Sequence, residues 1–213
     1  YRLPGINQVQ VHEKIDLSFE RVLRSALRQD PDIVLVGEMR DQMTAEIGMR
    51  ASITGHMVLS TLHTNDVIST PIRLLDMGVP RYMVALSLQM VVAQRLVRVI
   101  CENCGEAHSP SPAEHEWLKY ELADKVDAYS YKRGRGCSQC NGTGYTGRTG
   151  VYEVLEMTND LVEAINHEDT GMFVQAARKQ MAGQTLRRDA VRLVVNGRTT
   201  IDEAMRISNQ FED

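Results

Sequence analysis

Four cysteines stand in two pairs whose spacing is typical of metal ligands. The pairs are Cys101 with Cys104 and Cys137 with Cys140. Two residues between the thiolates let both sulfurs reach one ion from a tight turn, whose backbone amides also stabilise the anionic sulfur. Gly105 and Gly142 should give these turns the freedom they need. Because four soft thiolates suit Zn²⁺ in a closed tetrahedron, we predict a structural zinc site.

Other interpretations of the cysteines stay open. Two disulfides or two separate redox pairs need conditions that nothing else supports, because residues 1–10 lack the basic start and apolar centre of a secretion signal. The segment Cys137–Gly144 also resembles one zinc repeat of the J-domain co-chaperones. Those proteins use several such units, however, and the first cysteine pair here is followed by Gly105, Glu106 and Ala107, without the second glycine.

A carboxylate and an imidazole follow two apolar runs. The run Ile33–Val36 predicts a strand covered on both faces in a parallel sheet, and Glu38 comes soon after it. The run 56–62 predicts a second strand, which His63 follows. Since ligands bind beyond the carboxyl ends of parallel strands, Glu38 and His63 should form one site if the strands are neighbours. A loop ion pair of Glu38 with Arg40, and a core or capping role for His63, are the alternatives.

The elements that must hold these side chains alternate along the chain. Helices expected at about 18–29 and 43–52 precede the two strands, which predicts an α/β fold with right-handed crossovers. Further strands are expected at 6–11 and 151–155. Further helices are expected at 66–77, 80–100, from Ser111 onward, and at 160–166, 173–181, 186–195 and 201–207. Ser18 should cap the first of these helices, and Ser111 with Glu114 should form a capping box at the start of another. Thr200 with Glu203 should form a capping box at the last helix, and Gly197 should end the helix before it.

Composition limits the class of protein. The chain has 213 residues, 43% of them hydrophobic, enough for a buried core and one or two domains. A formal net charge of −4 offers no strongly basic surface and argues against nucleic acid as a partner. The longest apolar candidate, 82–100, is broken by polar residues, so we expect a soluble chain. The sequence has no initiator Met and begins like the middle of a folded unit, which suggests a piece of a longer protein.

Two segments resemble the Walker B and histidine boxes of the ATPases of type II secretion and type IV pilus assembly. These segments are Asp30–Asp41 and Gly55–Asp66. Gln94–Arg98 and Gly147–Glu153, on either side of the cysteine pairs, also match that family, so the resemblance covers nearly the whole chain. The cysteine pairs resemble those of the secretion and pilus-extension members. The C-terminal third most resembles the members that serve the mannose-sensitive haemagglutinin pilus.

The resemblance implies a RecA-like P-loop core that acts as a cytoplasmic hexamer with ATP and Mg²⁺. Such a motor moves an inner-membrane platform protein, with associated cytoplasmic adaptors, and lies at the inner membrane through these partners. Glu38 would act on the metal-bound or attacking water, and His63 would sense the terminal phosphate. The nucleotide site would further include Gly37, Arg40, His56 and Thr61. At the start of its strand, however, His56 has a simpler structural interpretation.

The sequence departs from the family in one important respect. It contains no GxxxxGK[ST] motif, so the backbone cradle and lysine that hold the β- and γ-phosphates are absent from these residues. The family's preceding acidic box is absent as well. Because phosphoryl transfer depends on positioning the phosphates, we predict that this chain alone neither hydrolyses ATP measurably nor binds it tightly.

A change of composition at Cys101 predicts three parts. They are the C-terminal part of the ATPase core at 1–100, a cysteine module at 101–147 and a helical domain at 148–213. A zinc-stabilised docking module for inner-membrane platform proteins is the first alternative function. A motor for DNA transfer is the second, and the cysteine pairs argue against it.

Overall fold

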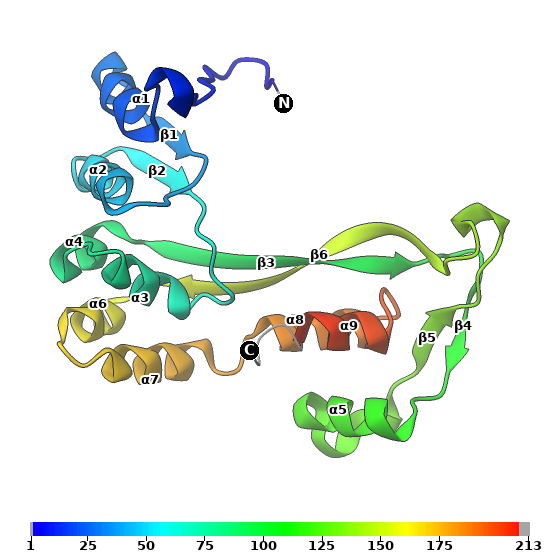
Figure 1. Ribbon diagram of the computed structural model, residues 1–213. Coiled ribbons are helices and arrows are strands. Elements are labelled where there is room, and N and C mark those ends of the chain that lie inside the picture. Colours follow the sequence, from blue (N-terminus) through cyan, green and yellow to red (C-terminus); the bar gives the residue numbers. More distant parts are fainter. Residues whose placement is uncertain (1, 209–213) are drawn as a thin grey trace. The chain divides into compact units, whose positions relative to one another are not determined.

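The computed structural model describes residues 2–208, apart from the side chain of Glu13. The chain forms two compact units. The described residues of the first unit are 2–64, 68–89 and 156–176. Those of the second unit are 65–67, 90–155 and 177–208 (Figure 1). Both units are therefore assembled from separate segments of the chain.

The first unit contains two short parallel strands. Strand β1 (Ile33–Val36) pairs with strand β2 (Met57–Ser60), with Val36 opposite Ser60. Both predicted strands are therefore present, and they are direct neighbours, as the argument from their apolar runs required. Their carboxyl ends lie at one edge of the sheet.

Two helices cover one face of this strand pair. Helix α1 (Phe19–Ala26) is capped by the hydroxyl of Ser18, and helix α2 (Gln42–Ile53) is capped by the carboxylate of Asp41. Such caps satisfy amides that the first turn of a helix leaves without a partner. The apolar side chains that pack together here are Phe19, Leu23, Leu27, Val34, Val36, Ile47 and Val58.

The prediction that β1 is covered on both faces is wrong for the described structure. Ile33 and Leu35 alternate with the buried valines of β1 and are 61% and 71% exposed. Met57 and Leu59 lie beside them on β2 and are exposed too. The reason is that α1 and α2 both pack on the opposite face, where Val34 and Val36 point.

The rest of the first unit is helical. Its helices are α3 (Ser69–Asp76), α4 (Arg81–Ser87), α6 (Asn159–Asn166) and the first part of α7 (Thr170–Met181). Helix α4 packs against both α2 and α6, and the Arg81 guanidinium donates a hydrogen bond to the Ile165 carbonyl at 3.2 Å. The buried side chains of these helices include Leu74, Met83, Val84, Leu161 and Phe173.

The predicted helix at 80–100 is only partly correct. Residues Arg81–Ser87 form α4, but Met90–Ile100 form strand β3, which pairs with strand β6 (Tyr145–Glu156) in the second unit and its border. Four valines and an isoleucine make β3 rich in β-branched side chains, which favour strands. The apolar residues of this segment are compatible with either a helix or a strand. Pairing with β6, more than 40 residues away in sequence, makes the segment a strand.

Two helices pack on this second sheet. Helix α8 (Leu186–Val195) ends at Gly197, which adopts a φ of 66°, as predicted, and helix α9 (Ile201–Ser208) follows. Together with β3 and β6 they bury a continuous apolar core. Its central side chains are Val97, Val151, Leu186, Val191, Val194, Ile201 and Ile207.

The chain between the cysteine pairs forms a small module. Strands β4 (Gly105–His108) and β5 (Tyr131–Gly134) are antiparallel, and helix α5 (Pro112–Leu122) lies between them in sequence. The predicted capping box is confirmed, since Ser111 and Glu114 exchange hydrogen bonds. Leu118 of α5 is fully buried in the same core as α8 and α9. The Arg187 guanidinium also stacks on Trp117 and Tyr120 of α5, at 4.7 Å and 4.2 Å from the ring centres.

The carboxylate of Glu203 joins α9 to β3. The Thr200 hydroxyl caps α9 by accepting from the Glu203 amide, which is one half of the predicted capping box, while the Glu203 carboxylate binds Arg98 and Arg206 instead of closing the other half. The Glu203 carboxylate is 1% exposed and accepts hydrogen bonds from the Arg98 amide and guanidinium, both at 2.8 Å, and from Arg206. Burial alone would raise the pKa of Glu203, but these bonds outweigh it and lower the pKa to about 2. Glu203 is therefore an ionised, buried anchor.

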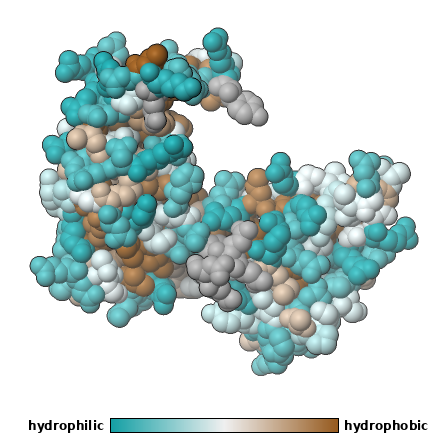
Figure 2. Space-filling model, viewed as in Figure 1, coloured by the Kyte–Doolittle hydropathy of each residue, from teal (hydrophilic) through white to brown (hydrophobic). Residues whose placement is uncertain are grey.

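The predicted strand at 6–11 is absent, because this segment is largely exposed and has no strand to pair with among residues 2–208. The remaining predicted helices appear with bounds shifted by a few residues at most, and the strand expected at 151–155 lies within β6. An α/β fold is therefore confirmed. No helix within residues 2–208 is both long and apolar enough for a membrane crossing. In the view of Figure 2 the surface is largely hydrophilic, with hydrophobic side chains gathered in separate patches.

Candidate functional site

The carboxyl ends of β1 and β2 bring Glu38 and His63 together. The Nε2 atom of His63 lies 3.2 Å from Oε2 of Glu38, within hydrogen-bond distance. The two residues are 25 positions apart in sequence, and the parallel pairing of the strands that precede them accounts for their contact. The juxtaposition that the sequence predicted is thus present.

Arg40 also contacts the Glu38 carboxylate. Its Nε lies 2.6 Å from the same oxygen that faces His63. The hydrogen bond from Arg40, and secondarily that from His63, lower the pKa of Glu38 below its ordinary value. Glu38 is therefore an ionised acceptor at neutral pH. The ion pair that we weighed as an alternative for Glu38 does exist, and it coexists with the contact to His63.

Backbone contacts fix the loops that carry these side chains. The Met39 amide donates to the Thr61 carbonyl at 3.1 Å, and the Thr61 hydroxyl donates to the Gly37 carbonyl at 2.7 Å. These bonds continue the pairing of β1 with β2 past the ends of the strands. Gly37 and Thr61 thus hold the site's framework, and their predicted contact with nucleotide stays a prediction.

His56 lies elsewhere. It precedes β2, at the amino end of the strand pair, whereas Glu38 follows β1 at the carboxyl end. Its Nδ1 contacts the Ala51 carbonyl at 3.0 Å and the Thr54 hydroxyl at 3.3 Å. These contacts fit the structural interpretation of His56 and do not bring it to Glu38 or His63.

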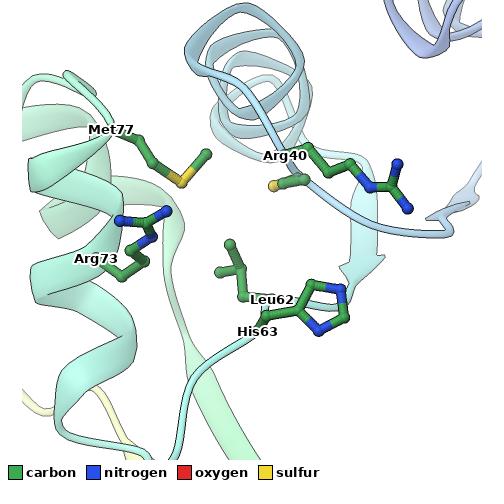
Figure 3. A pocket seen from close by; sticks show the side chains of 6 residues that line it. Arg40, Leu62, His63, Arg73 and Met77 are labelled. Carbon is green, nitrogen blue, oxygen red and sulfur yellow. The ribbon is translucent and has the colours of Figure 1, made fainter.

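A hollow of about 350 Å³ adjoins the pair of Glu38 and His63 (Figure 3). Its walls are formed by Met39, Arg40, Leu62, His63, Arg73 and Met77. In Figure 3, Arg73 on α3 and Met77, directly after the end of that helix, face the segment that carries Leu62 and His63. A group bound in this hollow would therefore touch basic side chains next to an ionised carboxylate.

The four cysteines gather in the second unit at distances that fit one metal ion. All four sulfurs lie within 4.8 Å of one another. The measured separations are 3.9 Å for Cys101 and Cys137, 3.8 Å for Cys104 and Cys140, and 3.7 Å for Cys137 and Cys140. A tetrahedron with metal–sulfur bonds of about 2.3 Å has edges of about 3.8 Å. The donor set therefore fits a single tetrahedral ion, and no cysteine is left over.

Hydrogen-bond donors surround these sulfurs. The Gly136 amide donates to Cys104, the Cys137 and Gly144 amides donate to Cys140, and the Asn103 side chain donates to Cys137, all at 3.2–3.3 Å. The amide of Cys137, helped by that of Gly144, lowers the pKa of Cys140 to about 6 against the effect of burial. Burial instead raises the pKa of Cys104 to about 11. The hydrogen bond from Asn103 also lowers the pKa of Cys137, so the turns favour thiolate at both Cys137 and Cys140.

Glycines permit this close packing. Gly142 has a φ of 76°, as the predicted turn requires, but Gly105 lies in regular β4 and needs no special conformation. Gly134 and Gly144 approach so closely that a side chain on either would overlap the other's backbone. The roles of Gly134, Gly136 and Asn103 were not predictable from the sequence, because no motif marks these residues.

Comparison with known proteins shows the family to which the chain belongs. The family model described as type II/IV secretion system protein matches residues 1–206. This chain belongs to that family. The type II secretion system protein E of Pseudomonas aeruginosa is 42% identical over 210 residues, which cover 99% of this chain and 41% of the relative. The type IV pilus assembly ATPase PilB of Thermus thermophilus is 40% identical over 205 residues, which cover 96% of this chain and 23% of that relative.

Solved structures support the fold alone. The ATPase DotB of Legionella pneumophila superposes with a TM-score of 0.61 at 20% identity, covering 91% of this chain and 42% of that one. The ATPase DotB of Yersinia pseudotuberculosis gives the same TM-score at 21% identity. The chain therefore spans about two fifths of the length of these structures and of its type II secretion relatives.

In this member of the type II/IV secretion family, no sequence motif marks Arg73, which lines the hollow. Arg73 lies on α3, ten positions after His63, in the helix that the sequence predicted at about 66–77. No part of the two boxes reaches it. Only the folded structure places Arg73 at the same hollow as Arg40 and His63.

Proposed function

We propose that this chain is the C-terminal part of a longer ATPase that powers pilin or pseudopilin assembly by type IV pilus or type II secretion machinery. In this proposal the residues before Cys101 form the C-terminal part of a RecA-like P-loop core. The whole protein acts as a cytoplasmic hexamer on an inner-membrane platform protein. Membership of the type II/IV secretion family supports the general role. The observation that carries the catalytic part is the 3.2 Å contact of Glu38 with His63 at adjacent strand ends.

The chemistry assigned to the site follows from its charges. Glu38 is ionised, so its carboxylate can accept a hydrogen bond from a water that is bound to Mg²⁺ or about to attack the terminal phosphate. The His63 side chain is 87% exposed and can turn toward that phosphate, while the ion pair with Arg40 keeps Glu38 in place. Mg²⁺, bound together with ATP, would neutralise charge that develops on the phosphate oxygens. Arg40 holds the carboxylate from its other side.

The test is a phosphate-release assay on the full-length protein. We expect Glu38→Gln to lower kcat at least 100-fold, because the amide keeps the size of the side chain but removes the negative acceptor. Asp16→Asn is the matched control, since it removes an exposed carboxylate whose ion pair within residues 2–208 is with Arg21, and it should leave kcat unchanged. Full activity of Glu38→Gln would reject the catalytic assignment.

The present chain should be inactive by itself. It contains no GxxxxGK[ST] motif, so the lysine and backbone cradle for the phosphates must come from other residues. Measurable hydrolysis by residues 1–213 that disappears in Glu38→Gln would contradict this part of the proposal. The assignment to the mannose-sensitive haemagglutinin pilus, and the division at residues 100 and 147, stay predictions.

For the second unit we propose a Zn²⁺ ion held by Cys101, Cys104, Cys137 and Cys140. The sulfur separations of 3.7–3.9 Å support a tetrahedral ion, and four thiolates leave no position for substrate. A zinc-stabilised docking module for platform proteins or their cytoplasmic adaptors is therefore a second function, compatible with the first. If docking is its role, a cysteine variant of the full-length protein should lose platform binding but keep ATP hydrolysis per folded molecule.

A further inference from the structure

The hollow beside Glu38 and His63 is lined by three basic and three apolar side chains. No acid lines it among the residues that the structure describes. The carboxylate of Glu38, which adjoins the hollow, is already engaged by Arg40 at 2.6 Å and by His63 at 3.2 Å. With Arg40 balanced by Glu38, the charge of Arg73 is left over, and the hollow favours an anion.

Arg73 differs from Arg40 in having no counter-charge. Arg73 is exposed, and no hydrogen bond or ion pair engages its side chain within residues 2–208. An arginine that supports the fold would be expected to meet a carboxylate or a carbonyl, as Arg81 does at Ile165. A guanidinium also presents a planar set of donors that matches two phosphate oxygens at once.

Hydrogen bonds hold helix α3, which carries Arg73, at both of its ends. Before α3, the Thr64 and Thr70 hydroxyls are hydrogen-bonded at 2.7 Å, which ties the segment after His63 to the first turn of the helix. After α3, the Gln42 side chain donates to the Gly78 carbonyl at 2.8 Å, which ties its end to α2. Leu74, next to Arg73, is buried and anchors the helix. The backbone of α3 is therefore fixed where Arg73 lines the hollow.

We propose that Arg73 binds the terminal phosphate group of the nucleotide, from the side of the hollow opposite Arg40 and His63. This inference rests on the proposed ATPase function. In the site, Glu38 would face the water while Arg73 donates hydrogen bonds to the phosphate oxygens. Such donors, placed where charge develops, contribute both to binding and to turnover. The group bound is the γ-phosphate of ATP or the inorganic phosphate released from it, since both present the same oxygens.

The test measures binding of three probes to the full-length protein by calorimetry: a non-hydrolysable ATP analogue, ADP and inorganic phosphate. We expect Arg73→Ala to weaken the ATP analogue at least tenfold and ADP less than twofold, because ADP lacks the terminal phosphate. Arg73→Lys should recover part of the loss, since a lysine keeps the charge without the planar donors. Arg28→Ala removes an exposed arginine that lines no part of this hollow and serves as the control.

Each outcome decides the inference. Selective loss of the ATP analogue supports contact with the γ-phosphate, and an added loss of inorganic phosphate binding extends the contact to the product. Equal loss of the analogue and ADP, or no loss of either, would overturn it while leaving the ATPase proposal intact. If the wild-type protein binds none of the probes and hydrolyses no ATP, the proposed function fails first. Thermal melting of the variants, which should match the wild type, excludes misfolding.

Discussion

The two candidate sites are built in opposite ways. At the strand ends, the His63 side chain is 87% exposed and that of Glu38 is 21% exposed, and the two contact one another directly, beside an open hollow. At the cysteine cluster, Cys101, Cys104 and Cys140 are buried, and backbone amides donate to the sulfurs of Cys104 and Cys140. The first site has free space and spare charge for a ligand that comes and goes. The second is closed around its donors and suits an ion that stays.

This difference separates function from stability. Side chains at the strand ends can be removed without leaving buried groups unsatisfied, so their loss should change chemistry more than folding. The cysteines close a segment that contains β4, α5 and β5, and no disulfide does so. Metal binding in such a segment contributes directly to its folding free energy. Variants of the two regions should therefore fail by different measurements.

The largest effect should come from the cysteines. Replacing Cys140 by Ala removes one of four ligands and the best-prepared thiolate, so metal content should fall from about one Zn²⁺ per chain to nearly none. Hydrogen exchange should then accelerate over residues 101–147 and little in the first unit. Gln139→Ala changes an exposed residue between Cys137 and Cys140; this variant is the control and should retain the ion. A metal-free protein with full protection of this segment would contradict the structural role of the site.

A smaller effect should follow at the anchor between α9 and β3. Glu203→Gln leaves the Arg98 amide and two guanidinium groups without their anion, so the free energy of unfolding should fall by about 2–3 kcal/mol in chemical denaturation. The loss of stability is no larger because the guanidinium groups of Arg98 and Arg206 are half exposed and partly screened by solvent. Asp202→Asn, at the exposed neighbouring position, should change it little. Equal losses in the two variants would show that the buried pairing contributes nothing.

The same residue predicts a direction for pH dependence. The pKa of Glu203 is lowered from 4.5 to about 2 in the folded chain, so its stabilising contribution is present above about pH 5 and is lost as pH falls toward 2. The second unit of the wild type should lose stability over that interval, and Glu203→Gln should lose less. Parallel pH profiles of the two proteins would disprove this assignment.

The smallest effect on folding should come from Arg40. Removing the guanidinium in Arg40→Ala should raise the pKa of Glu38 toward its ordinary value, because the hydrogen bond from Arg40 is the main cause of the lowering. A carboxyl-carbon NMR titration would measure this change. Thermal melting should hardly move, since the Arg40 side chain is 66% exposed. A large loss of stability would erase the contrast between the two regions.

Local sequence determined much of this protein. The cysteine spacing, the caps at Ser18, Ser111 and Thr200, and the polar residues after two apolar runs were readable because each depends on neighbours within a few positions. The contact of Glu38 with His63 was also predictable, since parallel strands place their carboxyl ends at one edge.

Only the tertiary structure decided the rest. Residues Met90–Ile100 form a strand because β6 pairs with them, and Ile33 and Leu35 are exposed because the described helices pack on the other face. The Glu203 carboxylate reaches Arg98 across 105 positions, and Arg73 reaches the hollow through the path of α3. These outcomes depend on partners distant in sequence, whose positions no local periodicity encodes. Composition and spacing thus specified the chemical groups, and long-range packing specified which of them meet.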